Sequence, residues 1–328
     1  MIEMSAIETS GLTKAYGDLT AVDDLDLVVE EGEVFGFLGP NGAGKSTTIN
    51  MLLDFTRPTA GSATVLGYDA QAEADAISPR VGVLPEGFDI YPRLSGRRHI
   101  EFAIKTKGAT DDPDEILERA GLSADDAARP AGDYSKGMRQ RLATGIALVG
   151  DPDLLIMDEP SSGLDPNGIS EMQELVRSEA ERGTTVFFSS HILEHVEAVC
   201  DRVGVLNEGE LVAVDTIEGL REQFGGGATM TLTLAGPAAE VQAVADELQG
   251  VTDVTASGRT LECTIADPAA KARLVTELAD AGATIRDLRI EEVSLDSLFT
   301  ALTNGDVDGS KTQAEPDDAI AMESEVAR

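Results

Sequence analysis

Gly39-Pro-Asn-Gly-Ala-Gly-Lys45-Ser46 is the stretch that decides the fold of this 328-residue chain. It matches the pattern G-x-x-x-x-G-K-[ST]; the apolar run Val34–Leu38 precedes it, and a helical pattern over Lys45–Leu53 follows it. In such a strand–loop–helix unit, glycines let successive backbone N–H groups converge on phosphate oxygens, and the helix N-terminus adds partial positive charge. We therefore expect Lys45 to reach the β- and γ-phosphates of a nucleotide and the Ser46 hydroxyl to bind Mg²⁺.

A second apolar run ends in two carboxylates, in Asp153-Leu-Leu-Ile-Met-Asp158-Glu159-Pro160. A buried strand can deliver one carboxylate to a magnesium shell and the next to an attacking water. We expect Asp158 to hold the metal, usually through water, and Glu159 to act as the general base or to position that water. An Asp-Glu pair after an apolar run can also be a mere helix start, and it is the pairing with the phosphate loop that makes this one specific.

The wider pattern predicts an α/β fold with a mostly parallel sheet, because short β-branched runs alternate with longer amphipathic stretches as far as about residue 215. Between residues 86 and 150 the strand signal vanishes, so we expect an inserted helical subdomain over about residues 87–150. The expected strands are Val34–Leu38, Val81–Leu84, Leu154–Met157, Thr185–Ser189 and Val203–Leu206.

The segment Tyr134-Ser-Lys-Gly-Met-Arg-Gln-Arg141 indicates the family. With the phosphate loop and the carboxylate pair, it resembles the ATPase subunit of an ABC transporter over roughly residues 5–220. In that family the corresponding signature reads L-S-G-G-Q and binds the γ-phosphate of the ATP held by the opposing protomer. The resemblance gives that role to Ser135 and the Gly137 backbone N–H.

Two signature positions, Lys136 and Met138, depart from the second Gly and the Gln of the family pattern. A similar S-K-G-M variant is common among exporters of drugs and polysaccharides, so the two departures indicate a resemblance to that exporter subfamily. The C-terminal stretch Ser294-Leu-Asp-Ser-Leu-Phe299 also resembles the end of those exporters' ATPase subunits.

The remaining motifs follow in the family's order. Tyr16 matches the aromatic residue that stacks on adenine, and Asp165, in Ser162-Gly-Leu-Asp165, matches the loop that crosses between protomers. Glu86 stands where the glutamine loop usually has an amide, a loop that senses the metal and contacts the membrane subunit. Its carboxylate could still reach Mg²⁺ or its water. His191 matches the switch histidine that hydrogen-bonds the γ-phosphate.

The resemblance implies an ATPase that uses ATP and Mg²⁺. The implied catalytic residues are Glu159, His191 and Lys45, and the implied metal-binding residues are Ser46, Asp158 and Glu86. The implied ATP-binding positions are Tyr16, Gly39, Pro40, Asn41, Gly42, Ala43, Gly44, Lys45, Ser46 and Thr47.

The expected partners are a second copy of the chain, with two ATPs sandwiched between the copies, and a separate polytopic permease. A membrane span needs about 20 mostly apolar residues and the chain has no such run, so the channel must be another polypeptide. We also see no signal peptide. The expected location is therefore cytoplasmic, peripheral on the inner face of the cell membrane.

Charge is the outlying feature of the composition. Asp plus Glu total 60 against 25 Lys plus Arg, which gives a net charge of -35. So large an excess repels itself at low salt and is screened at high salt, so we expect a halophilic source with a high-salt cytoplasm. The same charge argues against nucleic acid as the main partner. Two cysteines cannot build a disulfide framework or a four-ligand zinc site.

Two further histidine patterns occur in the sequence. His191 and His195 are spaced i, i+4, but position 192 is not Glu and a third ligand is not evident, so we do not expect a metal site there. His99 lies beside Arg97 and Arg98 on a helical pattern, and we expect it on a solvated face.

The domain organisation predicted from the sequence has three parts. Residues 1–222 form the ATPase domain, and a glycine joint at 225–227 leads to a small domain at 228–303 whose β-α-β-β-α-β pattern predicts a ferredoxin-like unit. Its last short helix is expected over Ser294–Leu302. Residues 304–328 are predicted to be a disordered acidic tail.

Two other functions remain open at this stage. A soluble ABC ATPase acting on ribosomes or DNA usually carries two ATPase domains, long coiled coils or zinc motifs, and none of these is evident here. A phosphate-loop kinase or GTPase would have no use for a signature at Ser135, and the guanine-specifying N-K-x-D is absent.

Overall fold

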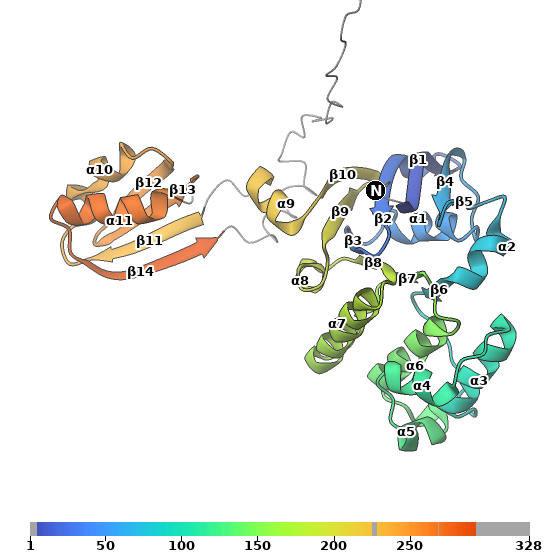
Figure 1. Cartoon of the computed structure of the whole chain (residues 1–328). Coiled ribbons are helices and arrows are strands. Elements are labelled where there is room, and N and C mark those ends of the chain that lie inside the picture. Colours follow the sequence, from blue (N-terminus) through green and yellow to red (C-terminus); the bar gives the residue numbers. More distant parts are fainter. Residues whose placement is uncertain (1–4, 225–227, 268, 293–328) are drawn as a thin grey trace, which may run out of the picture.

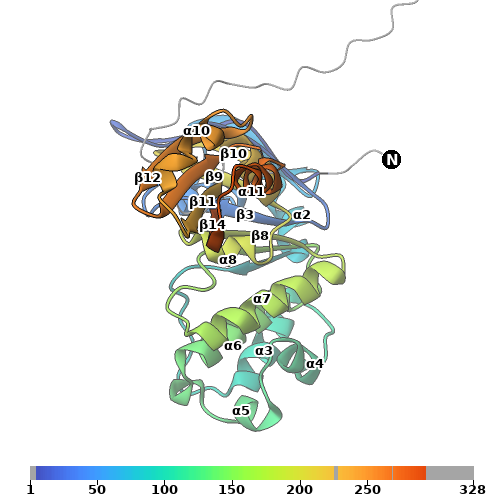
Figure 2. The same cartoon turned by 90° about the vertical axis from the view of Figure 1, so that its left-hand side faces the viewer.

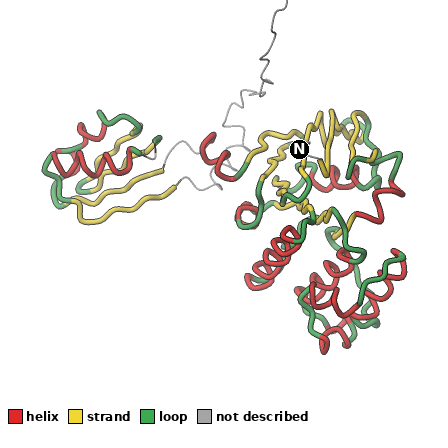
Figure 3. Tube along the Cα trace, viewed as in Figure 1, coloured by secondary structure: helices red, strands yellow, loops and turns green. Residues whose placement is uncertain are grey.

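Two sheets form the N-terminal part of the molecule. The computed structural model describes residues 5–224, 228–267 and 269–292. The first sheet is antiparallel, with the strand order β2-β1-β4-β5 (Figures 1 and 3). Its strands are β1 (Ser5–Tyr16), β2 (Leu19–Glu30), β4 (Ala60–Val65) and β5 (Tyr68–Asp69). The strands predicted from the sequence did not include this sheet.

The second sheet has six strands in the order β10-β9-β3-β8-β7-β6, and only β10 runs antiparallel to its neighbour. This confirms the predicted mostly parallel sheet. Its central strands are buried along their whole length, which explains why they are mostly apolar. The strands are β3 (Val34–Leu38), β6 (Val81–Leu84), β7 (Leu154–Met157), β8 (Thr185–Ser190), β9 (Arg202–Asn207) and β10 (Glu210–Asp215).

Helices pack on both faces of the six-stranded sheet. On one face, α1 (Lys45–Leu52) lies between the two sheets in a core that includes the stacked rings of Phe35 and Phe187. On the other face, α7 (Pro166–Glu181) and α8 (Leu193–Glu197) contribute to a second core. The smaller helices are α2 (Ala74–Ile77), the 3₁₀ turn η1 (Ser78–Arg80) and α9 (Ile217–Phe224).

A helical subdomain lies beyond the edge strand β6, within the residues where the strand pattern is lost (Figure 1). Four of its helices begin at capping side chains, those of Ser95, Asp112, Ser123 and Ser135, each of which accepts a backbone N–H. Its elements are α3 (Gly96–Lys107), α4 (Pro113–Arg119), α5 (Ala124–Ala128), η2 (Ala131–Asp133) and α6 (Lys136–Leu148). Helix α7 lies beside this subdomain, on the side that faces the viewer in Figure 2.

The expectation for His99 was wrong. The side chain is 95% buried: its Nε2 accepts the Tyr91 backbone N–H at 3.0 Å, and its Nδ1 lies 2.8 Å from the Ser95 carbonyl oxygen. The neighbouring arginines misled the prediction, because they pair with Glu101 and Asp114 on the outer side of α3 while His99 faces inward.

The C-terminal unit is a four-stranded antiparallel sheet with the order β12-β13-β11-β14. Its helices pack against a core that includes Leu232, Cys263 and Leu274. The elements are β11 (Ala228–Leu234), η3 (Ala238–Glu240), α10 (Gln242–Asp246), β12 (Val251–Ser257), β13 (Thr260–Ile265), α11 (Ala270–Asp280) and β14 (Ile285–Glu292). The predicted helix over 294–302 and the tail at 304–328 lie outside the described residues.

Candidate active site

The phosphate loop leaves the end of β3 and returns as the first turn of α1. The Gly39 backbone N–H donates to the Ser190 carbonyl oxygen at 3.1 Å, which ties the loop to β8. Gly44 has a φ of 111°, and a Cβ there would lie 2.4 Å from the Ala21 carbonyl oxygen, so only glycine fits. Helix α1 has no side-chain cap, and its first-turn N–H groups are therefore available to an anion.

Lys45 is almost completely buried, with 6% of its surface exposed. Its Nζ donates to the carbonyl oxygens of Gly39 and Pro40, at 2.7 and 3.2 Å, and lies 3.3 Å from Glu159 Oε1. Ser46 and Thr47 follow on the first turn and are half-buried, whereas Asn41 and Gly42 form the exposed tip of the loop. The ammonium group is thus held over the loop by two backbone carbonyl oxygens and the Glu159 carboxylate.

Asp158 and Glu159 follow β7, which is hydrogen-bonded to β8, and both are less than a tenth exposed. Ser189, near the end of β8, joins them: its Oγ donates to Asp158 Oδ1 at 2.5 Å and accepts the Glu159 backbone N–H at 3.0 Å. The sequence interpretation missed Ser189. A serine at the end of an all-buried strand, beside a strand that ends in carboxylates, is the signal that could have identified it.

Glu159 has two features of a strained functional residue. Its φ is +50°, a left-handed conformation that costs a non-glycine residue about 1–3 kcal/mol. Its Oε1 is buried with no hydrogen bond and has only the Lys45 ion pair, while Oε2 lies 2.8 Å from His191 Nδ1. We call Lys45, Asp158, Glu159, Ser189 and His191 the catalytic cluster.

Other predicted residues lie outside this cluster. Tyr16 is 51% exposed at the β1–β2 turn, with Lys14 Nζ 5.0 Å from its ring centroid. Glu86 is exposed on the loop after β6, a strand whose Leu84 carbonyl oxygen accepts the Asp158 backbone N–H at 2.8 Å. The strand pairing brings the loop of Glu86 to the edge of the cluster, but the carboxylate itself points to no partner there that the structure describes.

The signature and the loop of Asp165 form the N-terminal caps of two helices. Ser135 Oγ accepts the Met138 backbone N–H at 3.2 Å, and Asp165 Oδ1 accepts the Gly168 backbone N–H at 2.8 Å. Ser135, Lys136 and Asp165 are all exposed, and Gly137 and Met138 are half-buried. Within one copy of the chain these groups are therefore free to meet a second molecule.

The i, i+4 histidines do not form a metal site within the described residues. His191 contacts Glu159, whereas His195 Nδ1 lies 2.7 Å from Ser161 Oγ, and no group of three or more metal-ligating side chains occurs in that part of the chain. Burial lowers the pKa of His195.

The residues of the loop and cluster fit a magnesium nucleotide. The uncapped α1 N-terminus and the glycine cradle suit phosphate oxygens, and Lys45 can exchange two carbonyl partners for them. The Ser46 hydroxyl and the Asp158 carboxylate are hard oxygen ligands of the kind Mg²⁺ prefers. Together the fold and the site define a phosphate-loop nucleoside triphosphatase.

Comparison with known proteins identifies the family. A family model described as ABC transporter matches residues 22–162. The chain is 34% identical to the linearmycin resistance ATP-binding protein LnrL of Bacillus subtilis, covering 90% of this chain and 98% of LnrL. It is 35% identical to the daunorubicin/doxorubicin resistance ATP-binding protein DrrA of Streptomyces peucetius, over 94% and 95% of the two chains.

Solved structures agree with this family assignment. An ATP-binding subunit of an ABC transporter superposes with a TM-score of 0.61 at 29% identity, covering 67% of this chain and 94% of that one. A dimeric bacterial ABC transporter cassette, MJ0796, superposes at 0.58 with 25% identity, covering 64% and 98%. The chain therefore belongs to the ABC transporter family as an ATP-binding subunit that hydrolyses ATP. Among the described residues, no helix is long and apolar enough to cross a membrane.

Proposed function

We propose that this chain powers an exporter by hydrolysing ATP on the inner face of the cell membrane, with a separate polytopic permease as the channel. The observation that carries the proposal is the catalytic cluster, in which Lys45 and His191 contact the two carboxylate oxygens of Glu159. The direction of transport is supported by the names of similar proteins, which include resistance proteins and a Nod factor export protein of Rhizobium etli.

The cluster suggests how this chain's residues act in hydrolysis. Glu159, held by His191, orients the attacking water and accepts its proton. Lys45 leaves the carbonyl oxygens of Gly39 and Pro40 to stabilise charge on the phosphates, and His191 donates to the γ-phosphate. Ser46 and Asp158 would hold Mg²⁺, which when bound neutralises charge on the phosphate oxygens; Glu86 is a further candidate ligand from the neighbouring loop.

A second copy of the chain completes the proposed site. Ser135 and the Gly137 backbone N–H would bind the γ-phosphate held by the opposite copy, and the loop of Asp165 would cross between the copies. The exposure of Ser135 and Asp165 in the single chain, together with the dimeric state of the MJ0796 cassette, supports this arrangement. The C-terminal unit, which we assign as ferredoxin-like, would add to the dimer contact.

Glu159→Gln tests the assignment of the base. The amide keeps the shape of the side chain but cannot accept a proton, so we expect ATP hydrolysis to fall by about 10²–10⁴-fold. ATP binding should persist, and light scattering should show an ATP-bound dimer that does not dissociate. Glu194→Gln, the same change at an exposed position on α8, is the matched control. Wild-type turnover by Glu159→Gln would refute the assignment.

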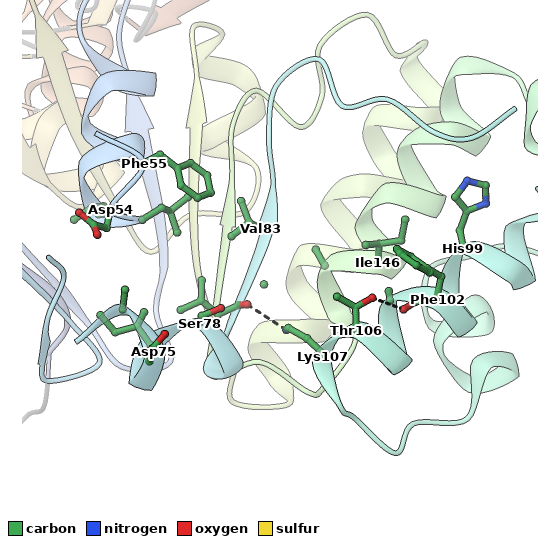
Figure 4. Close-up of a pocket in the computed structure, with 18 of the residues that line it drawn as sticks. Asp54, Phe55, Asp75, Ser78, Val83, His99, Phe102, Thr106, Lys107 and Ile146 are labelled. Atoms are coloured by element: carbon green, nitrogen blue, oxygen red, sulfur yellow. Dashed lines mark hydrogen bonds between the residues drawn. The ribbon is translucent and has the colours of Figure 1, made fainter. Parts of the chain in front are cut away.

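The contact with the permease is proposed at a cavity of about 730 Å³ between the helical subdomain and α1, α2 and β6 (Figure 4). Three exposed aromatic rings line it, those of Phe55, Tyr91 and Phe102, at 70%, 65% and 61% exposure. Such a cluster of exposed rings is typical of a protein interface.

The charges in this cavity indicate the chemistry of its partner. Asp54, Asp75 and Asp89 line it, whereas the lining cation Lys107 has its Nζ on the carbonyl oxygens of Val81 and Val149. We therefore expect a cytoplasmic permease segment with an apolar face and basic flanks.

A tagged pull-down from membranes in molar KCl tests this docking. We expect one polytopic protein, identified by mass spectrometry, at one copy per ATPase subunit. Tyr91→Ala should lose it while the isolated subunit keeps its ATPase rate. Recovery of ribosomal or DNA-repair proteins with no polytopic partner would instead favour a soluble ABC ATPase.

A further inference from the structure

Three side-chain contacts join the turn after β7 to the end of β8 and the start of α8. The first two, made by Ser189 and His191, end on the carboxylates of the catalytic cluster. The third is the hydrogen bond between His195 and Ser161, 2.7 Å from Nδ1 to Oγ. This third contact ends on no group that touches phosphate or water, and the proposed mechanism does not use it.

The Ser161–His195 contact is partly buried. Ser161 is buried and His195 is half-buried, and both line a small pocket together with Pro160, Met172 and Phe188. Burial lowers the pKa of His195, which favours the neutral ring. A neutral ring that carries its hydrogen on Nε2 can accept the Ser161 hydroxyl hydrogen at Nδ1.

Each partner of this bond is closely coupled to a catalytic residue. Ser161 is two residues from Glu159, across Pro160, whose ring fixes its φ. His195 is four residues from His191, on the short helix α8, which begins two residues after His191 and packs tightly against β3: a Cβ built on Gly36 would lie 2.3 Å from Val196 Cγ1. A change in the Ser161–His195 separation should therefore move Glu159 against His191.

We propose that the Ser161–His195 hydrogen bond is a positioning contact that sets the alignment of Glu159 and His191 for ATP hydrolysis. His195 is a positioning residue because it acts through its neighbours. The proposal rests on the roles proposed above for Glu159 and His191. It predicts that losing the contact lowers the rate of the chemical step. Nucleotide binding should stay intact, because Lys45 and the phosphate loop lie on another element.

The test measures steady-state ATP hydrolysis by the full chain in molar KCl. His195→Ala should lower kcat about tenfold, which corresponds to about 1.4 kcal/mol, the size of one hydrogen bond. KM for ATP should stay within about twofold. His195→Asn places an amide oxygen where Nδ1 stood, and we expect it to restore most of the rate. The control is Glu194→Gln, one residue away and exposed.

Ser161→Ala provides the second arm, since it removes only one hydroxyl and should fold even if His195→Ala does not. It should lower kcat as much as His195→Ala, and the double variant should be no slower than either single one. Wild-type kcat in a folded His195→Ala variant, additive losses, or failure of His195→Asn to restore the rate would each overturn the proposal. If Glu159→Gln also turns over at the wild-type rate, it is the proposed function that fails.

Discussion

Tyr16 stands alone among the predicted ATP-binding residues, because it lies on the antiparallel sheet while the others lie on the phosphate loop. Its ring is half exposed and has a lysine ammonium above it. A half-exposed ring gives up few contacts when it stacks on a nucleobase. The stacked faces gain dispersion energy, worth about 1–3 kcal/mol per stacked base.

Tyr16→Ala should therefore weaken ATP binding by about tenfold or more, while Tyr16→Phe keeps it within about twofold. Titration of a fluorescent ATP analogue gives both dissociation constants. Tyr91→Ala is the matched control, since it removes an equally exposed tyrosine from the permease-docking cavity. Equal affinities for Tyr16→Ala and the wild type would show that the adenine binds elsewhere.

Among single residues, the sequence singled out four of the five members of the catalytic cluster but not how they meet. The phosphate loop is a continuous motif, so Lys45 and Ser46 can be placed from local spacing alone. The contacts of Glu159 with Lys45 and His191 depend on the order of three parallel strands, β3, β8 and β7, which no local pattern records. Ser189 was missed for the same reason.

At the scale of elements, a buried ion pair joins the helical subdomain to α7. Both carboxylate oxygens of Glu179, which is fully buried, accept from Arg119 on α4, at 2.8 and 2.5 Å. Arg119 also lies 3.0 Å from Asp151. Helix α4 packs on the signature helix α6, and Glu179 lies near the C-terminal end of α7, so this pair braces the helical subdomain against α7.

Removing one partner of this pair should lower the free energy of unfolding far more than removing both. Arg119→Met leaves the Glu179 charge buried without a partner, and we expect the free energy of unfolding to fall by about 3–5 kcal/mol. The double variant Arg119→Leu/Glu179→Leu should recover most of that loss. Guanidinium unfolding followed by circular dichroism measures both.

The matched control for the buried pair is Arg141→Met, which breaks the more exposed pair with Glu171 and should cost at most about 1 kcal/mol. If Arg119→Met cost no more than this control, the buried pair would not brace the two helices.

Element patterns also explain where the sequence interpretation was incomplete. The central parallel strands are short, buried and mostly apolar, so they were located to within a residue or two. Strands β1 and β2 are instead 12 residues long and alternate buried and exposed residues over only part of that length, with exposed acidic residues and register shifts in their pairing. Those charges obscured the period-two pattern, and the antiparallel sheet went unpredicted.

For the whole molecule, the net charge of -35 should decide how stability depends on salt. The described surface holds ion pairs such as Arg80–Asp153 and Arg129–Asp126, and salt weakens these attractions. Acidic residues outnumber basic ones 60 to 25, however, so most carboxylates have no cation to pair with. Repulsion therefore outweighs attraction at the surface, and screening should stabilise the fold.

We expect the melting temperature of the full chain to rise steeply between about 0.1 M and 1 M KCl, over which the screening length falls from about 10 Å to about 3 Å. Choline chloride at equal ionic strength should give much of the same rise, because screening does not depend on the cation. Glu179 is fully buried and the Arg119 side chain is only 15% exposed, so the loss in Arg119→Met should change little between the two concentrations. A melting temperature that stays flat or falls with KCl would mean that the acidic surface is not an adaptation to salt.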